Sequence, residues 1–525
     1  MGMTLLERLR MAGMLAFALT AAVPLWAQQT SQEQTQGEAE KAEAQKPEQQ
    51  KPESRMTPAQ AKELFASVDT ILQFASDDSK LAIKSKVKRR LTSRDAVEKY
   101  LIDKMKDDKD AKRMERSEIV LKKFGLIDQD FHLQTFLVSL LKEQIAGYYD
   151  SKTKTVNLLD WIEPDTQKPV LAHELTHALQ DQRVNLEKWE DQSNDDISHN
   201  VMEDNQRVAT DEQDTAREAV LEGQAMAVLV DYSLKPMGQS ILTSPDLVKS
   251  KADEQGADAD SPVLQRAPLL LQEALLFPYR EGLKFEVDLL QDKGPAGAFG
   301  GVLDRPPATS FEIMNPHAYE GRVKVPLMKM PDVHPLLDTD YAPYDIGVMG
   351  QLDVRILAEL FGGPQTAAAL AQSWAGGVYY AVQKRNAPDK SSTSSISLLY
   401  LSQWKSPEAA AAFARMYADE LAKQYSGVTR DVQTESDEGE QVFKTNEGPV
   451  LISTSGKSVF VSESFDLTLA RKLEFLMMGA QQGNDQNQAI ALAHPNHALT
   501  GSMVNFFAGC GLMRAAIPHG AARLY

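Results

Sequence analysis

The sequence predicts an α+β fold, with a helix-rich core, a small β-hairpin beside one central helix, and a small C-terminal α+β domain. Apolar residues recur at helical spacing in most segments up to about residue 385. Alternating apolar and polar residues bounded by turn signals, typical of strands, occur near residue 150 and again after residue 391. The composition, 42% hydrophobic and 25% charged, excludes collagen-like, coiled-coil and wholly disordered chains.

Residues 1–27 have the pattern of a secretory signal peptide. Arg8 and Arg10 precede an apolar run, and the small Ala27 stands where cleavage is expected. The run is shorter than the roughly 20 residues of a membrane span, and the rest of the chain offers no comparable one. We therefore expect a protein exported to the periplasm or the extracellular space, with no stable membrane span after cleavage. Residues 28–56, rich in Gln, Glu, Lys and Pro, predict a disordered linker.

The core domain is expected at 57–390, with a helical N-terminal part at 57–143. Thr57-Pro58 predicts the first helix start, and Thr92-Ser93-Arg94-Asp95 predicts another. Gln144–Asp150, a turn after Asp150 and Thr153–Leu159 then predict the hairpin.

Two helices follow the hairpin, at about 168–183 and 215–232, and the acidic segment 185–214 between them predicts an exposed insertion. Helices and loops are expected up to about residue 385. The C-terminal α+β domain is expected at 391–480, behind a Ser/Thr linker. Its predicted elements are a strand at 396–401, a helix opening at Ser406-Pro407, strands within 441–462 and a helix at 466–478. Residues 481–525 predict an irregular tail.

Charge and cysteine content exclude several functions. The formal net charge of −18 argues against a nucleic-acid partner. Cys510 is the single cysteine of the sequence, which excludes intrachain disulfides, Cys-rich zinc ribbons and iron–sulfur centres. A metal site in this chain must therefore draw on its nine histidines and on carboxylates.

The segment Val170–Gln180 carries the most specific pattern. Its apolar residues make one helical stripe, and His173 and His177, four positions apart, lie on a single helical face where both imidazoles can bind one ion. Glu174 is rotated off that face, so it can reach a metal-bound water as a general base without being a ligand. The alternative is a pair of histidines hydrogen-bonded between helices.

A catalytic zinc site uses three protein ligands, and Glu222 is the best candidate for the third. It stands among apolar helical neighbours, where a carboxylate is costly unless it is paired or bound to a cation. Gly223 would let two helices approach closely, and Glu218, one turn earlier, would orient a ligand histidine. Three alternatives stay open. Glu218 could be the ligand in place of Glu222, Glu222 could be an ordinary ion-paired residue, or Asp181 could be a further ligand on the histidine face.

His173-Glu174-x-x-His177 followed by Glu222-Gly223-x-Ala225 resembles the gluzincin-type zinc metallopeptidases, whose third ligand is a downstream glutamate. His173–Gln182 is similar to a motif of a poorly characterised group of secreted prokaryotic proteins. That likeness covers about residues 90–385. It includes the segments Gln144–Asp150, Leu276–Tyr279 with Gly282, Pro306–Ser310 through Pro316–Tyr319, and Trp374–Tyr379. The 44 residues between His177 and Glu222 exceed the usual gluzincin gap, and Trp374–Val378 lacks an expected acidic residue.

The resemblance implies a zincin-like core holding one Zn²⁺ per chain on His173, His177 and Glu222, with Glu174 as general base in the hydrolysis of a peptide or protein substrate. The predicted hairpin would bind an extended substrate by strand addition. Candidates for the oxyanion donor, none favoured by the sequence, are Tyr149, Tyr319, Tyr341, Tyr344 and His317. The alternatives are a non-catalytic zinc-binding scaffold and a zinc hydrolase of a non-peptide bond.

Overall fold

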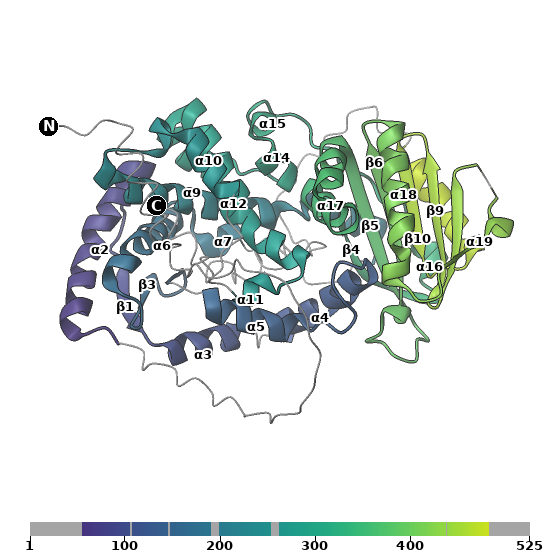
Figure 1. Cartoon of the computed structure of the whole chain (residues 1–525), viewed down its shortest axis with the longest axis horizontal. Helices are drawn as coiled ribbons and strands as arrows, with labels where there is room; N and C mark the ends of the chain where they lie inside the picture. The colour runs from purple at the N-terminus through teal and green to yellow at the C-terminus, as the bar shows by residue number, and fades with distance from the viewer. Residues whose placement is uncertain are drawn as a thin grey trace, which may run out of the picture. The chain divides into compact units, whose positions relative to one another are not determined.

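The computed structural model describes residues 55–104, 108–144, 147–190, 199–253, 262–436 and 438–481. They form a helix-rich α+β fold with two sheets (Figure 1). The expected signal peptide, nearly all of the linker at 28–56, and the tail with Cys510 lie outside the described residues. No helix among the described residues is both long and apolar enough to cross a membrane.

The N-terminal part is helical, as the sequence predicts, but it also contains a strand. Helix α2 begins where Thr57 caps it, and its side-chain oxygen accepts a hydrogen bond from the Gln60 N–H. The helices here are α2 (Pro58–Ser79), α3 (Arg94–Lys104), α4 (Asp108–Lys123) and α5 (Leu133–Gln144). Strand β1 (Lys88–Thr92), which was not predicted from the sequence, lies between α2 and α3.

The predicted hairpin is present and forms a three-stranded sheet with β1. Strands β2 (Tyr148–Asp150) and β3 (Thr155–Leu159) pair antiparallel, and β1 pairs parallel with the other edge of β3. The sheet order is therefore β1-β3-β2. The Asp150 side chain accepts hydrogen bonds from the Lys152 and Thr153 N–H groups, which closes the turn.

Three long helices pack together behind the hairpin: α6 (Pro164–Val184), α9 (Gln213–Leu234) and α12 (Leu269–Ala296). Gly223 of α9 faces Gly282 of α12, and a Cβ on Gly223 would lie 2.8 Å from Gly282 Cα. The close helix approach expected at Gly223 is confirmed, and its partner is α12.

The segment predicted to be an exposed insertion, 185–214, is in its described parts mostly helical and partly buried. It holds α7 (Leu186–Glu190) and α8 (Val201–Thr210). Asp204 and Arg207 are buried, and Asp204 pairs with His334 at 3.1 Å. The prediction of an exposed loop was wrong because acidic composition was taken for exposure, whereas these charges are buried with polar partners.

Smaller helices connect α9 to α12, and then α12 to the second sheet. They are η1 (Lys235–Met237), η2 (Ile241–Thr243), α10 (Pro245–Asp253), α11 (Pro262–Gln265), η3 (Gly297–Gly301), α13 (Val302–Asp304), α14 (Ser310–Met314), α15 (Pro316–Glu320) and α16 (His334–Leu337).

The second sheet is antiparallel, with seven strands in the order β4-β5-β6-β10-β9-β8-β7 (Figure 1). The strands are β4 (Tyr341–Val348), β5 (Trp374–Lys384), β6 (Ile396–Trp404), β7 (Thr429–Arg430), β8 (Glu440–Thr445), β9 (Gly448–Ser455) and β10 (Ser458–Glu463). Because β4 and β5 belong to it, the sheet crosses the boundary expected at residue 391.

Both faces of this sheet are covered. Helices α17 (Gln351–Ser373) and α18 (Pro407–Gln424) pack on the face that carries Tyr379 and Tyr400, and these side chains join the main core. The opposite face carries Val378, Tyr380 and Leu399, in a second cluster with α19 (Leu467–Gln481). The predicted strands and helices after residue 396 are all present.

Candidate metal centre

The start of helix α6, ahead of His173, is held to the hairpin by hydrogen bonds. The side chain of Gln167 is buried, accepts a hydrogen bond from Leu159 N–H at 2.9 Å, and donates to the carbonyls of Leu159 and Ile162. The end of β3 and the first turns of α6 are therefore joined by one amide. The helix then continues through His173 and His177 and ends at Asn185, in the left-handed conformation.

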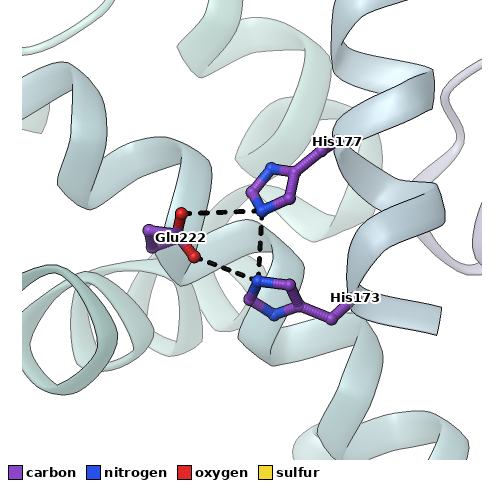
Figure 2. A group of neighbouring side chains, drawn as sticks. All are labelled: His173, His177 and Glu222. Atoms are coloured by element: carbon purple, nitrogen blue, oxygen red, sulfur yellow. Dashed lines mark hydrogen bonds and ion pairs between the residues drawn. The ribbon is translucent and has the colours of Figure 1, made fainter. Parts of the chain in front are cut away.

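His173, His177 and Glu222 converge from two helices (Figure 2). The Nε2 atoms of the two histidines are 3.1 Å apart. His173 Nε2 lies 3.0 Å from Glu222 Oε2, and His177 Nε2 lies 3.6 Å from Glu222 Oε1. The structure thus brings together the three side chains that the sequence analysis selected as metal ligands.

All three side chains are fully buried, with no exposed surface. Burial alone would raise the pKa of Glu222. Protonated histidines beside it, through the charge of His177 and hydrogen bonds from both rings, outweigh burial and lower that pKa well below its usual range. Glu222 is therefore a carboxylate with two nitrogen atoms directed at it, rather than a neutral acid in an apolar helix contact.

A chain of amides fixes the ring of His177. Gln224 Nε2 donates to the carbonyls of Ala298 and Phe299, so Gln224 Oε1 is left to accept from Gln180 Nε2 at 3.0 Å. Gln180 Oε1 then accepts from His177 Nδ1 at 2.9 Å. This assignment puts the proton of a neutral His177 on Nδ1 and leaves the lone pair of Nε2 facing Glu222 and His173.

Helix α12 also supports the site. The ring of Tyr279 stacks on that of His173, with centroids 6.4 Å apart. One turn further along, Gly282 contacts α9 next to Glu222, since a Cβ on Gly282 would lie 3.2 Å from Gly223 Cα. Tyr279 and Gly282 belong to a segment that the sequence analysis singled out, but neither was given a role there.

Glu174 follows His173 on α6 and is also fully buried. It is directed toward the hairpin, because a Cβ built on Gly147 would lie 3.8 Å from Glu174 Cγ. The Glu174 side chain, chosen as general base, therefore extends from α6 toward the residue that precedes β2.

Glu218 is buried one turn before Glu222. The orienting role predicted for it falls to Gln180 at His177, and within the described part of the chain His173 Nδ1 has no hydrogen-bond partner. Asp181 is buried near the end of α6, where it accepts from Tyr149 OH at 2.7 Å and pairs with Lys154. It anchors the hairpin to the helix.

The candidates for the oxyanion donor are distributed over several elements. Tyr149 OH is bound to Asp181, and Tyr319 OH donates to the Arg305 carbonyl. Tyr341 and Tyr344 lie on β4 in the seven-stranded sheet. His317, on α15, is 87% exposed and pairs with Glu320.

Asp292, His317 and Glu320 form a second group of possible metal donors. Two of the three are exposed, and Glu320 has Lys293 at 3.4 Å in addition to His317. Ordinary surface ion pairing accounts for this group. Among the described residues, the group on α6 and α9 is therefore the buried one.

Comparison with known proteins adds no relative. No family model, curated protein or solved structure matches this chain. Two imidazole nitrogens and one carboxylate, converging in a buried position, are donors suited to a divalent transition-metal ion.

Proposed function

We propose that the protein is an exported zinc-dependent peptidase, with one Zn²⁺ on His173, His177 and Glu222. The observation that carries the proposal is the ligand number. Three donors lie within 4.8 Å of one another, and the described residues add no fourth to this group. Structural zinc sites are closed by four protein ligands, whereas catalytic sites use three and keep one position for water or substrate.

The donor set fits zinc in chemistry as well as in number. The amide chain through Gln180 leaves His177 Nε2 unprotonated, as a metal ligand must be. Glu222 adds a carboxylate whose two oxygens face the two imidazoles, at 3.0 Å from His173 Nε2 and 3.6 Å from His177 Nε2. A zinc ion bound here would supply Lewis acidity, which polarises a carbonyl and lowers the pKa of a water molecule.

The chain's own residues would then perform the proton transfers. Glu174 would accept the proton of the attacking water on a carboxylate oxygen and pass it to the nitrogen of the leaving amine. Its position beside Gly147 places that carboxylate next to β2, an edge strand of the three-stranded sheet. An extended peptide paired with this strand would present its carbonyl groups along Glu174.

The complete burial of the triad favours one alternative, a metal site that stabilises a binding scaffold. A buried site also means that a peptide reaches the ligands only after the surrounding segments move. A zinc hydrolase acting on a non-peptide bond would use the same residues. Glu174 argues for catalysis, because a scaffold needs no base beside its metal.

Metal content and turnover separate these alternatives. The mature chain from Gln28 should contain about one zinc ion, lost in His173→Ala and Glu222→Ala but retained in the exposed-residue control His132→Ala. Glu174→Gln should retain zinc and lose peptide hydrolysis about 10²- to 10⁴-fold, while the exposed control Glu187→Gln keeps it.

Absence of zinc after reconstitution would contradict the proposal. Zinc without hydrolysis in a diverse peptide library would favour the scaffold. Hydrolysis of esters but not of peptides, lost in Glu174→Gln, would favour the non-peptide hydrolase.

A further inference from the structure

A pocket of about 280 Å³ opens beside the end of α6, beyond the two histidines. Three lysines line it, Lys84, Lys86 and Lys154, together with Tyr149, Asp181 and Gln182. Lys84 and Lys86 are exposed at the surface and come from the segment between α2 and β1. Lys154 comes from the hairpin turn. None of these side chains has a part in the proposed proton transfers.

The pocket has a net positive charge in a chain whose own net charge is −18. Among the described residues, the one carboxylate that lines the pocket is Asp181, and it already has partners. It accepts hydrogen bonds from Tyr149 OH and from the Leu186 N–H at 3.1 Å, and it forms an ion pair with Lys154 at 2.7 Å. Lys84 and Lys86 take part in none of the ion pairs found within the described ranges. Two ammonium groups are therefore left to attract an anion from solvent.

The two lysines are held in place relative to the metal centre. Gln182, on α6, accepts hydrogen bonds from the Lys84 and Ser85 N–H groups at 2.6 and 2.8 Å. Further along, the Lys88 N–H donates to the Lys154 carbonyl at 3.1 Å. The backbone that carries the lysines is thus attached to the same helix that carries His173 and His177.

The spacing relates the pocket to the proposed substrate path. Gly147, which directly precedes β2, lies beside Glu174, and Tyr149, two positions on within β2, reaches Asp181. Glu174 and Asp181 are seven positions apart on the helix, or about 10 Å at 1.5 Å per residue. An extended peptide advances about 3.3 Å per residue, so Asp181, which lines the pocket, lies about three residues along the helix from the bond beside Glu174. Lys84 and Lys86 line the same pocket from the segment before β1, the strand on the other edge of β3.

We propose that this lysine pocket is a substrate subsite that binds a carboxylate about three residues from the cleaved bond. The inference rests on the proposed peptidase function and adds the substrate class, peptides with an acidic group at that distance. The carboxylate is supplied by an Asp or Glu side chain or by the free C-terminus of the substrate.

The test uses two peptide series on the zinc-loaded full-length mature chain. In the first, one glutamate is moved along an Ala/Gly dodecapeptide with an amidated C-terminus, and each peptide has a glutamine counterpart. In the second, glutamine peptides carry a free C-terminus at varied distance. Binding to Glu174→Gln is followed by fluorescence anisotropy of a label on the peptide, and cleavage by wild type is followed by mass spectrometry.

We expect glutamate about three residues from the cleaved bond to improve binding and cleavage about tenfold over glutamine. The double variant Lys84→Gln/Lys86→Gln should abolish that preference, whereas Lys62→Gln/Lys457→Gln, which removes two exposed lysines elsewhere, should keep it. A preference confined to free C-termini would assign the pocket to the terminal carboxylate.

Cleavage without acidic preference, or a preference that survives the double variant, would overturn the subsite while leaving the peptidase proposal intact. Lysine-dependent binding of the acidic peptide without any cleavage would overturn the peptidase proposal and leave an anion-binding pocket. If the chain neither cleaves peptides nor binds the acidic peptide, the subsite and the peptidase proposal are both overturned.

Discussion

The two ring nitrogens of His177 face different partners, and this decides what the residue can bind. Nδ1 is held by Gln180, whose own amide is oriented by Gln224 and the carbonyls of Ala298 and Phe299. Each amide in this chain has both its donor and its acceptor in use. The carbonyls of Ala298 and Phe299 therefore set the tautomer of His177 through the two amides, although they contact none of the proposed metal ligands.

We predict that Gln180→Leu weakens zinc binding about 10- to 100-fold, because His177 Nδ1 loses its acceptor. Gln224 contacts neither histidine, so Gln224→Leu should also weaken zinc binding, but by a smaller factor. Competition with a chromophoric chelator measures both, after circular dichroism has shown that the variants are folded. Gln239→Leu, at an exposed position, is the control. An unchanged dissociation constant in Gln180→Leu would show that the amide chain does not orient the ligand.

At the residue scale, the sequence was sufficient to select His173, His177 and Glu222, because helical spacing and an isolated carboxylate in an apolar helix are local signals. It was not sufficient to find Gln224 as a supporting residue. The carbonyls that orient Gln224 follow α12, more than seventy positions along the chain. No local sequence pattern predicts the role of a polar residue whose hydrogen-bond partners are so distant in the chain.

At the scale of elements, the distance between α9 and α12 decides where Glu222 lies. The two helices meet at Gly223 and Gly282, where backbone packs against backbone. Glu222 is next to this contact and is directed at α6. Any side chain at Gly223 must push α12 away or move Glu222.

We predict that Gly223→Ala lowers the free energy of unfolding by about 1–3 kcal/mol, since the added Cβ would overlap the Gly282 carbonyl. The matched control is Gly479→Ala in α19, where a Cβ meets nothing within 4 Å. That variant should gain about 0.4–1 kcal/mol, because alanine has less freedom in the unfolded chain. Urea denaturation compares the two, and equal effects of the same sign would refute the close-packing argument.

Elements with their own periodicity were predicted, and those defined by distant partners were not. The hairpin, α6, α9 and α18 carry turn, capping or helical signals within their own residues. Strand β1 reads Lys-Arg-Arg-Leu-Thr and has no alternation, and its pairing partner β3 is far along the chain. A strand of this kind is formed by tertiary pairing rather than by local preference.

At the scale of the whole molecule, buried carboxyl groups link the site helices to the seven-stranded sheet. Glu212, just before α9, accepts a hydrogen bond from Ser310, and Asp211 accepts from the Val348 N–H at the end of β4. Burial raises the pKa of Glu212 to about 7. Burial, and then the charge of Glu212, raise the pKa of Asp353 to about 8.

These shifts predict that stability falls as the pH rises from 5 to 8. The native state keeps protons on Glu212 and Asp353 that the unfolded chain, with ordinary values of 4.5 and 3.8, has released. Each such group lowers the free energy of unfolding by up to about 1.4 kcal/mol per pH unit until the pH passes its native pKa. Urea midpoints measured at pH 5, 6, 7 and 8, at constant zinc occupancy, should therefore decrease.

Asp353→Asn identifies the source of this slope. The asparagine keeps an acceptor for the Gly350 N–H, which Asp353 binds at 2.9 Å, but it has no proton to lose. Its urea midpoints should fall less steeply with pH than those of wild type, and the curves should diverge toward pH 8. Asp419→Asn, at an exposed position on α18, should follow wild type throughout. Parallel curves for Asp353→Asn and wild type would mean that this carboxyl is already charged in the folded protein at pH 5.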